Sequence, residues 1–65
     1  MINTIVNGVS AYLTGNFYHE VKIYRDDELI DIVKVHCCED SEEASYSAIW
    51  LSKKLTQTEK ENFCY

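Results

Sequence analysis

The chain of 65 residues has 46% hydrophobic residues and carries 11 acidic against 6 basic residues, a formal net charge of −5. Net negative charge repels phosphate backbones and anionic lipid headgroups, so we expect no direct binding to nucleic acid and none to a membrane. A chain this short buries only about 60% of the surface that its unfolded form exposes. We therefore expect residues 1–65 to form a single small domain with little stability to spare.

The cellular location is predicted from two features of the sequence. The first residues, MINTIVNGVSAYL, lack the basic start of a secretory signal, and no apolar run approaches the ~20 residues needed to cross a bilayer. The 3 cysteines are odd in number, and two of them are adjacent, which favours reduced thiols over a disulfide framework. These features predict a cytoplasmic protein.

Alternating apolar residues and three turn signals predict an antiparallel meander of three to four strands. Asn7-Gly8 is the strongest short hairpin signal, because both central residues of a type I′ turn need positive φ. Thr14-Gly15-Asn16 predicts a second turn, which would place Val9 opposite Val21. Asp26-Asp27 predicts a third turn, because aspartate tolerates turn conformations.

The third hairpin has a predicted register of its own. Beyond residue 32, strict alternation would turn Lys34 inward, so we expect either a β-bulge near Ile32-Val33 or a strand end that is apolar on both sides. The expected pairs are two apolar ones and two of opposite charge: Ile23 with Ile30, Val21 with Ile32, Arg25 with Glu28, and Lys22 with Asp31.

A helical period replaces the alternation after the acidic residues 39–43 and predicts one α-helix over about residues 41–55. Asp40-x-x-Glu43 has the spacing of a capping box. The stripe that should cover the sheet consists of Ala44, Ala48, Leu51 and Leu55. Further on, Thr56-x-x-Glu59 and Thr58-x-x-Glu61 both resemble helix starts. The predicted fold class is thus α+β, an antiparallel β-meander with one helix packed on one face.

The expected helix has a second apolar face, which predicts a partner-binding site. On a helical projection this face consists of Tyr46, Ile49, Trp50 and Lys53. Tryptophan is enriched at binding hot spots, and small domains often gain burial by oligomerising. We therefore expect a non-enzymatic protein-binding or regulatory module that binds a protein partner and forms a homodimer.

Two alternatives concern which apolar surfaces stay open. Phe63 and Tyr65 could fold back onto Trp50 and Ile49 and close a small second core. The sheet face away from the helix is a second candidate surface, and it carries Tyr12, Tyr18, Tyr24 and Leu29, with Val33 and Val35 as further candidates.

The acidic residues support a different function. Carboxylates on a rigid surface can imitate a phosphate backbone and occupy the basic groove of a nucleic-acid-binding or defence protein, as inhibitors of the phage or mobile-element type do. The local alternative is that acids in turns and helix caps serve those elements. The residues concerned are Asp26, Asp27, Glu28, Glu39, Asp40, Glu42 and Glu43.

No set of residues predicts catalysis, a metal or a cofactor. His36-Cys37-Cys38, with His19 and Cys64 elsewhere, offers zinc-type ligands, but neighbouring strand residues point to opposite faces and no C-x2-C pair exists. The sequence also lacks a phosphate-binding glycine loop and a nucleophile elbow. We therefore expect no catalytic residue, no metal and no cofactor.

Overall fold

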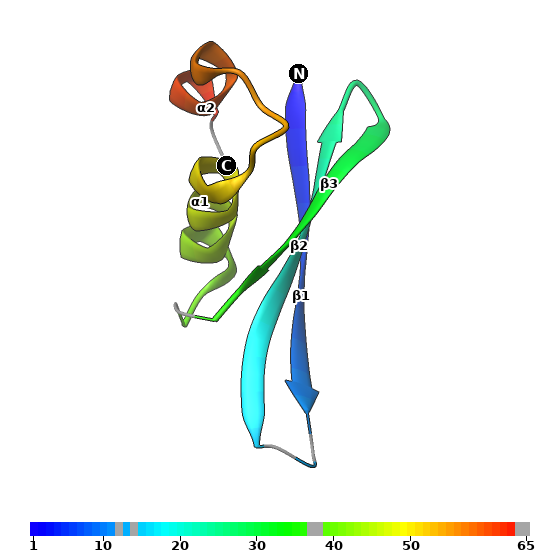
Figure 1. The fold of residues 1–65 in the computed structure, drawn as a ribbon, viewed down its shortest axis with the longest axis vertical. Coiled ribbons are helices and arrows are strands. Elements are labelled where there is room, and N and C mark those ends of the chain that lie inside the picture. The colour runs from blue at the N-terminus through cyan, green and yellow to red at the C-terminus, as the bar shows by residue number, and fades with distance from the viewer. Residues whose placement is uncertain (12, 14, 37–38, 64–65) are drawn as a thin grey trace.

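The fold is an α+β arrangement in which one main helix packs on a three-stranded antiparallel sheet, as predicted (Figure 1). The computed structural model describes residues 1–11, 13, 15–36 and 39–63. Strands β1 (Ile2–Ala11), β2 (Asn16–Arg25) and β3 (Glu28–Val35) lie in the order β1-β2-β3, followed by helices α1 (Ser41–Leu51) and α2 (Gln57–Asn62). The molecule is 38 Å long and 19 by 17 Å across. In Figure 1 the far ends of β1 and β2 extend beyond α1.

Strand β1 continues straight through Asn7-Gly8, so the predicted first hairpin is wrong. All ten residues of β1 pair with β2, and Val6, not Val9, lies opposite Val21. One long hairpin gains more cross-strand pairs than two short ones, which overrides the local turn preference. Gly8 is explained instead by Phe17, since a Cβ at Gly8 would lie 3.2 Å from a carbon of that ring.

The third turn occurs where the sequence predicts it, whereas the second turn lies slightly earlier than predicted, because Asn16 already belongs to β2 and pairs with Ala11. Gly15 of the second turn has φ +67°, and Thr14 lies outside the described residues. At the third turn Asp26 and Asp27 have φ values of 50° and 68°, the left-handed conformation that a two-residue hairpin loop requires.

A β-bulge in β3 decides which of its residues face the core. Tyr24 pairs with Leu29 while its neighbour Ile23 pairs with Asp31, so Ile30 is the extra residue. The predicted bulge therefore exists, two residues earlier than expected. Beyond the bulge, residues that strict alternation would place on the outer face point to the core, and those that it would place in the core point outward. The predicted pairs of Ile23 with Ile30, Val21 with Ile32 and Lys22 with Asp31 are wrong, whereas Arg25 does lie opposite Glu28.

This exchange places Val33 and Val35 on the core side, opposite Val21 and His19. Val35 is buried and Val33 packs against the core cluster, so neither belongs to the outer face of the sheet. Ile32 lies instead on the outer face, where 49% of its surface is exposed.

Helix α1 begins as predicted and ends four residues earlier than predicted. The Asp40 side chain accepts a hydrogen bond from the Glu43 backbone N–H at 2.8 Å, which satisfies one of the free donors of the first turn. The helix ends at Leu51 because Ser52 takes an extended conformation, and its hydroxyl donates to Asp31 Oδ2 of β3 at 2.6 Å. A second helix then starts at the Thr56 cap, where Thr56 and Glu59 form a complete capping box.

The helix is rotated relative to the predicted stripe. Leu51 is 63% exposed, whereas Ile49, predicted on the outer side, is fully buried. Leu55 is buried, but from the loop between the helices. Two hydroxyl contacts accompany this rotation: the Ser52 bond to Asp31 and a 3.1 Å bond between Ser45 Oγ and Thr4 Oγ1 of β1. The described core consists of Val21, Ile23, Val35, Ala44, Ala48, Ile49 and Leu55.

The rotation of α1 predicts opposite results for two similar substitutions. Ile49→Ala should lower the free energy of unfolding by about 2–5 kcal/mol, because it leaves a cavity in the core. Leu51→Ala should change it by less than about 0.5 kcal/mol, because that side chain is mostly in solvent. Urea unfolding followed by circular dichroism measures both. A larger loss from Leu51→Ala than from Ile49→Ala would contradict the observed rotation.

Candidate functional site

The predicted partner-binding residues of the helix do not form one exposed face. Trp50 is 51% exposed and Lys53 is exposed, but Ile49 lies in the core. Tyr46 is half-buried, and its ring meets the Phe63 ring edge-on at 5.3 Å between centroids. The chain after α2 thus folds back onto the helix, where Phe63 meets Tyr46 and packs against the core cluster that includes Ile49. Tyr65 lies outside the described residues.

The outer face of the sheet, which points away from both helices, carries the largest group of exposed aliphatic side chains. Ile5, Lys22 and Ile32 lie side by side across the three strands. The next row along the strands is Asn3, Tyr24 and Leu29. The exposed fractions of Ile5, Ile32 and Leu29 are 51%, 49% and 45%. We call these three residues the outer patch.

The other end of the same face is covered by its own side chains. The centroids of the Tyr18 and His36 rings lie 5.4 Å apart, and Lys34 Nζ lies 5.5 Å from the centroid of the Tyr18 ring. Aromatic and cation–π contacts of this kind satisfy an exposed ring locally. The uncovered apolar surface is therefore concentrated at the outer patch. Tyr12, which the sequence assigned to this face, lies outside the described residues.

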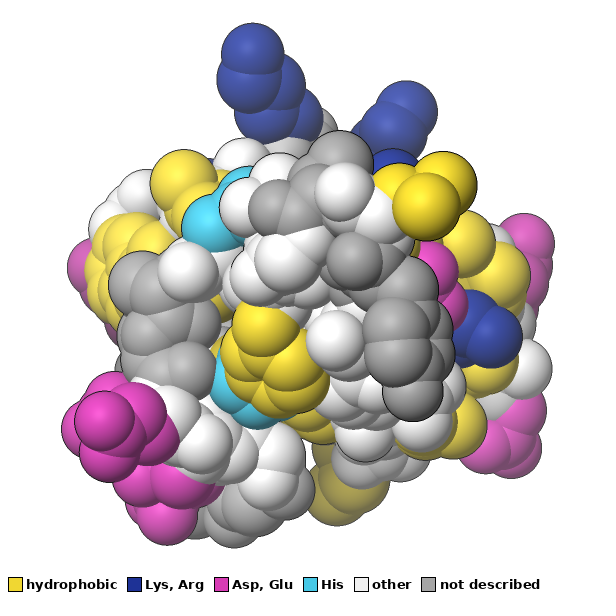
Figure 2. Space-filling view, turned by 90° about the horizontal axis from the view of Figure 1, so that it is seen from below, with side chains coloured by type: hydrophobic (Ala, Val, Ile, Leu, Met, Phe, Trp, Pro, Cys, Tyr) yellow, Lys and Arg dark blue, Asp and Glu magenta, His cyan; other side chains and the backbone are white. Residues whose placement is uncertain are grey.

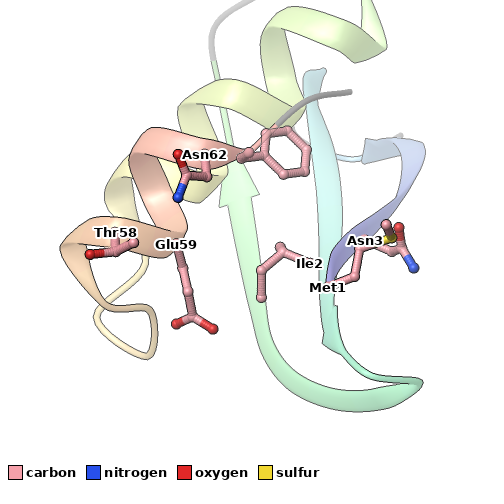
Figure 3. Close-up of a pocket in the computed structure, with 7 residues that line it drawn as sticks. Met1, Ile2, Asn3, Thr58, Glu59 and Asn62 are labelled. Atoms are coloured by element: carbon pink, nitrogen blue, oxygen red, sulfur yellow. The ribbon is translucent and has the colours of Figure 1, made fainter.

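A cleft of about 320 Å³ lies where the start of β1 meets α2 (Figure 3). Neighbouring strand residues point to opposite faces, so a cleft lined by both Ile2 and Asn3 reaches around the edge of the strand. Figure 3 shows Ile2 and Glu59 on opposite sides of this space. The lining residues are Met1, Ile2, Asn3, Thr58, Glu59, Asn62 and Phe63.

An ion pair between Arg25 and Glu59 fixes α2 at the end of the sheet. Arg25 Nε and Nη2 donate to the two Glu59 oxygens at 2.8 and 2.7 Å, and Nη2 also donates to the Lys54 carbonyl at 3.1 Å. The Arg25 hydrogen bonds, followed by the Thr56 backbone N–H, lower the pKa of Glu59 from 4.5 to about 2. Arg25 lies opposite Glu28 across the strands as the sequence predicts, and it forms its hydrogen-bonded ion pair with Glu59 of the later helix.

The acidic residues of the alternative function fall into two separate groups. Asp26, Asp27 and Glu28 lie at the β2–β3 turn, and residues 39–43 lie at the start of α1, toward the other end of the molecule in Figure 1. The view from below in Figure 2 shows acidic side chains at the lower left and others at the right, with basic side chains at the top. Asp40 caps α1, and Asp26 accepts a 2.7 Å bond from the Met1 amino group. The two groups do not form one continuous track.

The described residues include no group of three or more histidine, cysteine, aspartate or glutamate side chains that could hold a metal ion. His19 is buried, its Nδ1 has no hydrogen-bond partner among the described residues, and its ring meets the Phe17 ring edge-on at 5.0 Å. His36 stacks with Tyr18, on the other face of the sheet. Cys37, Cys38 and Cys64 lie outside the described residues.

Comparison with protein-family models, with curated proteins and with solved structures finds no match to this chain. Neither described helix is long and apolar enough to span a membrane.

The Arg25–Glu59 pair predicts a pH effect with a definite sign. The folded pKa of Glu59 lies below its ordinary value of 4.5, so the pair stabilises the fold above that pH and this stability is lost as the pH falls toward 2. In Arg25→Met the Glu59 pKa should rise toward 4.5, and the stability should depend less on pH in this window. Carboxyl ¹³C NMR titration and unfolding curves measure the two effects.

The control is Gln57→Ala, which removes the 3.2 Å hydrogen bond from Gln57 to Glu61 and leaves Arg25 in place. Glu59 should titrate in this variant as it does in the unmodified chain. An equal Glu59 pKa in Arg25→Met and in the unmodified chain would contradict the assignment.

Proposed function

We propose that the protein is a small, non-enzymatic, cytoplasmic module that binds a protein partner through the outer patch of its sheet. The observation that carries the proposal is the set of half-exposed aliphatic side chains on a sheet face that neither helix covers. Ile32 and Leu29 lie on β3 and Ile5 on β1, with Lys22 and Tyr24 of β2 between them. Apolar residues scattered singly on a surface are ordinary, but several on one uncovered face of a sheet form a patch.

The shape and chemistry of the outer patch favour a protein over a small molecule. Small-molecule sites are concave and enclose most of the ligand, whereas this patch lies on a sheet surface with each side chain about half exposed. Protein interfaces combine an apolar centre with a polar rim. Here Asn3 and Glu20 flank the patch on neighbouring rows, and the aliphatic stem of Lys22 lies between Ile5 and Ile32, from where a lysine can extend its charge into solvent.

Trp50 is a second candidate contact, on the helical layer. It is exposed beside Leu51, so it retains the role of binding anchor proposed from the sequence. Ile49 has no part in direct contact because it is fully buried. Helix and outer patch face different directions, so a partner that covers one does not cover the other.

A photo-crosslinking amino acid at one of three positions separates the candidate surfaces. Placed at Ile32 it samples the outer patch, at Trp50 the helix, and at Asp27 the acidic turn. In cells that make the protein naturally, we expect one defined protein adduct from position 32 and none from the other two. An adduct from position 50 alone or 27 alone would refute the outer patch and support the helix or the acidic inhibitor, respectively.

Matched substitutions test the energetic role of the outer patch. Ile32→Lys should weaken binding of the crosslinked partner at least about tenfold, because it places a charge in an apolar contact. Leu51→Lys adds the same charge to an exposed helix position and should leave binding unchanged. The affinity should also vary little between low and moderate salt, since screening weakens exposed charge pairs and not apolar contacts. A steep loss with salt would favour the acidic inhibitor.

A further inference from the structure

The outer edge of β1 offers a row of backbone groups to a further strand. The Asp26 backbone N–H donates to the Met1 carbonyl at 3.2 Å, which continues the β1–β2 ladder by one pair. Hydrogen-bonded pairs alternate along an antiparallel ladder. The odd-numbered residues of β1 therefore bond to β2, and the N–H and C=O groups of Thr4, Val6 and the other even-numbered residues point away from it. Among the described strands none pairs with this edge.

The two edges of the sheet differ in how they are protected. Strand β3 carries the bulge at Ile30 and the charged residues Glu28, Asp31 and Lys34. The outward Ile32 N–H is also occupied, because it donates to Asp31 Oδ1 at 2.9 Å. Bulges and charges are the devices by which proteins prevent edge-to-edge pairing.

Strand β1 has none of these devices. Its sequence, INTIVNGVSA, contains no charged residue and no proline. Its pairing with β2 is regular over all ten residues, without a bulge. A long, regular and uncharged edge is a template for strand addition.

We propose that β1 pairs with β1 of a second copy of this chain, antiparallel about a two-fold axis at Ile5, and so joins two three-stranded sheets into one. A neutral strand rich in β-branched residues pairs best with a strand of the same kind, and a second copy supplies one at equal concentration. This edge shares only Ile5 with the outer patch, and the strand pairing does not depend on a partner at Ile32 and Leu29, so the inference stands whether or not that patch binds a partner.

The local charge permits self-association in spite of the net charge of −5. Two acidic residues lie at the start of β1, and each is already paired: Asp26 with the Met1 amino group and Glu59 with Arg25. When two copies meet along β1, neither the Asp26 nor the Glu59 carboxylate therefore adds an unpaired charge to the contact.

The side chains select the register. An axis at Ile5 places Ile5 against Ile5 of the second copy, which covers a side chain that is 51% exposed in one chain. An axis one residue further along, at Val6, would set Ile5 against Asn7 instead.

Asn3 and Asn7 test this register, because the proposed axis places each opposite the other in the second copy. Both are exposed on the outer face. The double variant Asn3→Lys with Asn7→Lys sets lysine against lysine twice, and should raise the dissociation constant of the dimer about tenfold or more. Asn3→Glu with Asn7→Lys sets opposite charges together and should restore a dissociation constant at or below that of the unmodified chain.

Sedimentation velocity of the full chain from about 1 to 500 µM measures these constants, and circular dichroism checks the fold. A monomeric unmodified chain over this range overturns the proposal. So does a dimer that the two lysines leave unchanged, or one that the glutamate–lysine variant fails to restore. The Ile32→Lys variant should still dimerise, so a failure of the outer patch is distinguishable from a failure of the edge.

Amide hydrogen exchange tests the same contact without any substitution. The N–H groups of Thr4 and Val6 should exchange more slowly as the protein concentration rises, because they become bonded only in the dimer. The Lys34 amide points to the opposite edge by the same alternation and serves as the control. Concentration-independent exchange at Thr4 and Val6 would overturn the proposal even if the variants fail to fold.

Discussion

The length of one helix determines which surfaces of this protein are left open. An eleven-residue helix spans about 16 Å, while a ten-residue strand spans about 33 Å, so α1 covers roughly half the length of the sheet. It also covers only one of its two faces. The outer patch and the far ends of β1 and β2 are uncovered for this reason. Among the described residues the remaining element is α2, which lies at one end of the sheet and on the same side as α1.

Hydrogen bonds from serine hydroxyls, together with apolar packing, fix the rotation of this helix on the sheet. Ala44 and Ala48 allow the helix to approach the sheet closely, but small side chains distinguish poorly between one rotation and another. Ser45 and Ser52 are buried and bond to side chains of the two edge strands, Thr4 and Asp31. A buried hydroxyl that lost its partner would carry a desolvation cost of about 1–3 kcal/mol, so these bonds favour one rotation.

Local signals in the sequence predicted what local interactions decide. The turn at Asp26-Asp27, the Asp40 cap and the Thr56 cap all occur where the residue types indicate. Asn7-Gly8 failed because pairing along the whole of β2 outweighs a turn preference. The helical stripe was misplaced because apolar residues alone were used to place it, whereas Ser45 and Ser52 bond to the sheet through their hydroxyls.

The candidate surfaces were predictable only in part, because their outlines depend on contacts between distant parts of the chain. The exposure of Trp50 and the presence of Tyr24 and Leu29 on the outer face follow from helical and strand periodicity. Ile5 and Ile32 could not be assigned to that face without the true register of β1 and the position of the bulge. The difference between the two edges of the sheet likewise depends on strand order, which pairwise patterns do not determine.

The bulge at Ile30 also has a consequence for the order of folding. Near the Asp26-Asp27 turn the regular and the bulged registers share the pairs Arg25 with Glu28 and Tyr24 with Leu29. A hairpin in which only these pairs have formed is therefore compatible with both registers. Only the bulged register turns Asp31 inward, where Ser52, 21 residues later, can bond to it. The register of β3 thus depends on a contact with a distant part of the chain, which forms when α1 docks. Interactions within the hairpin alone do not select it.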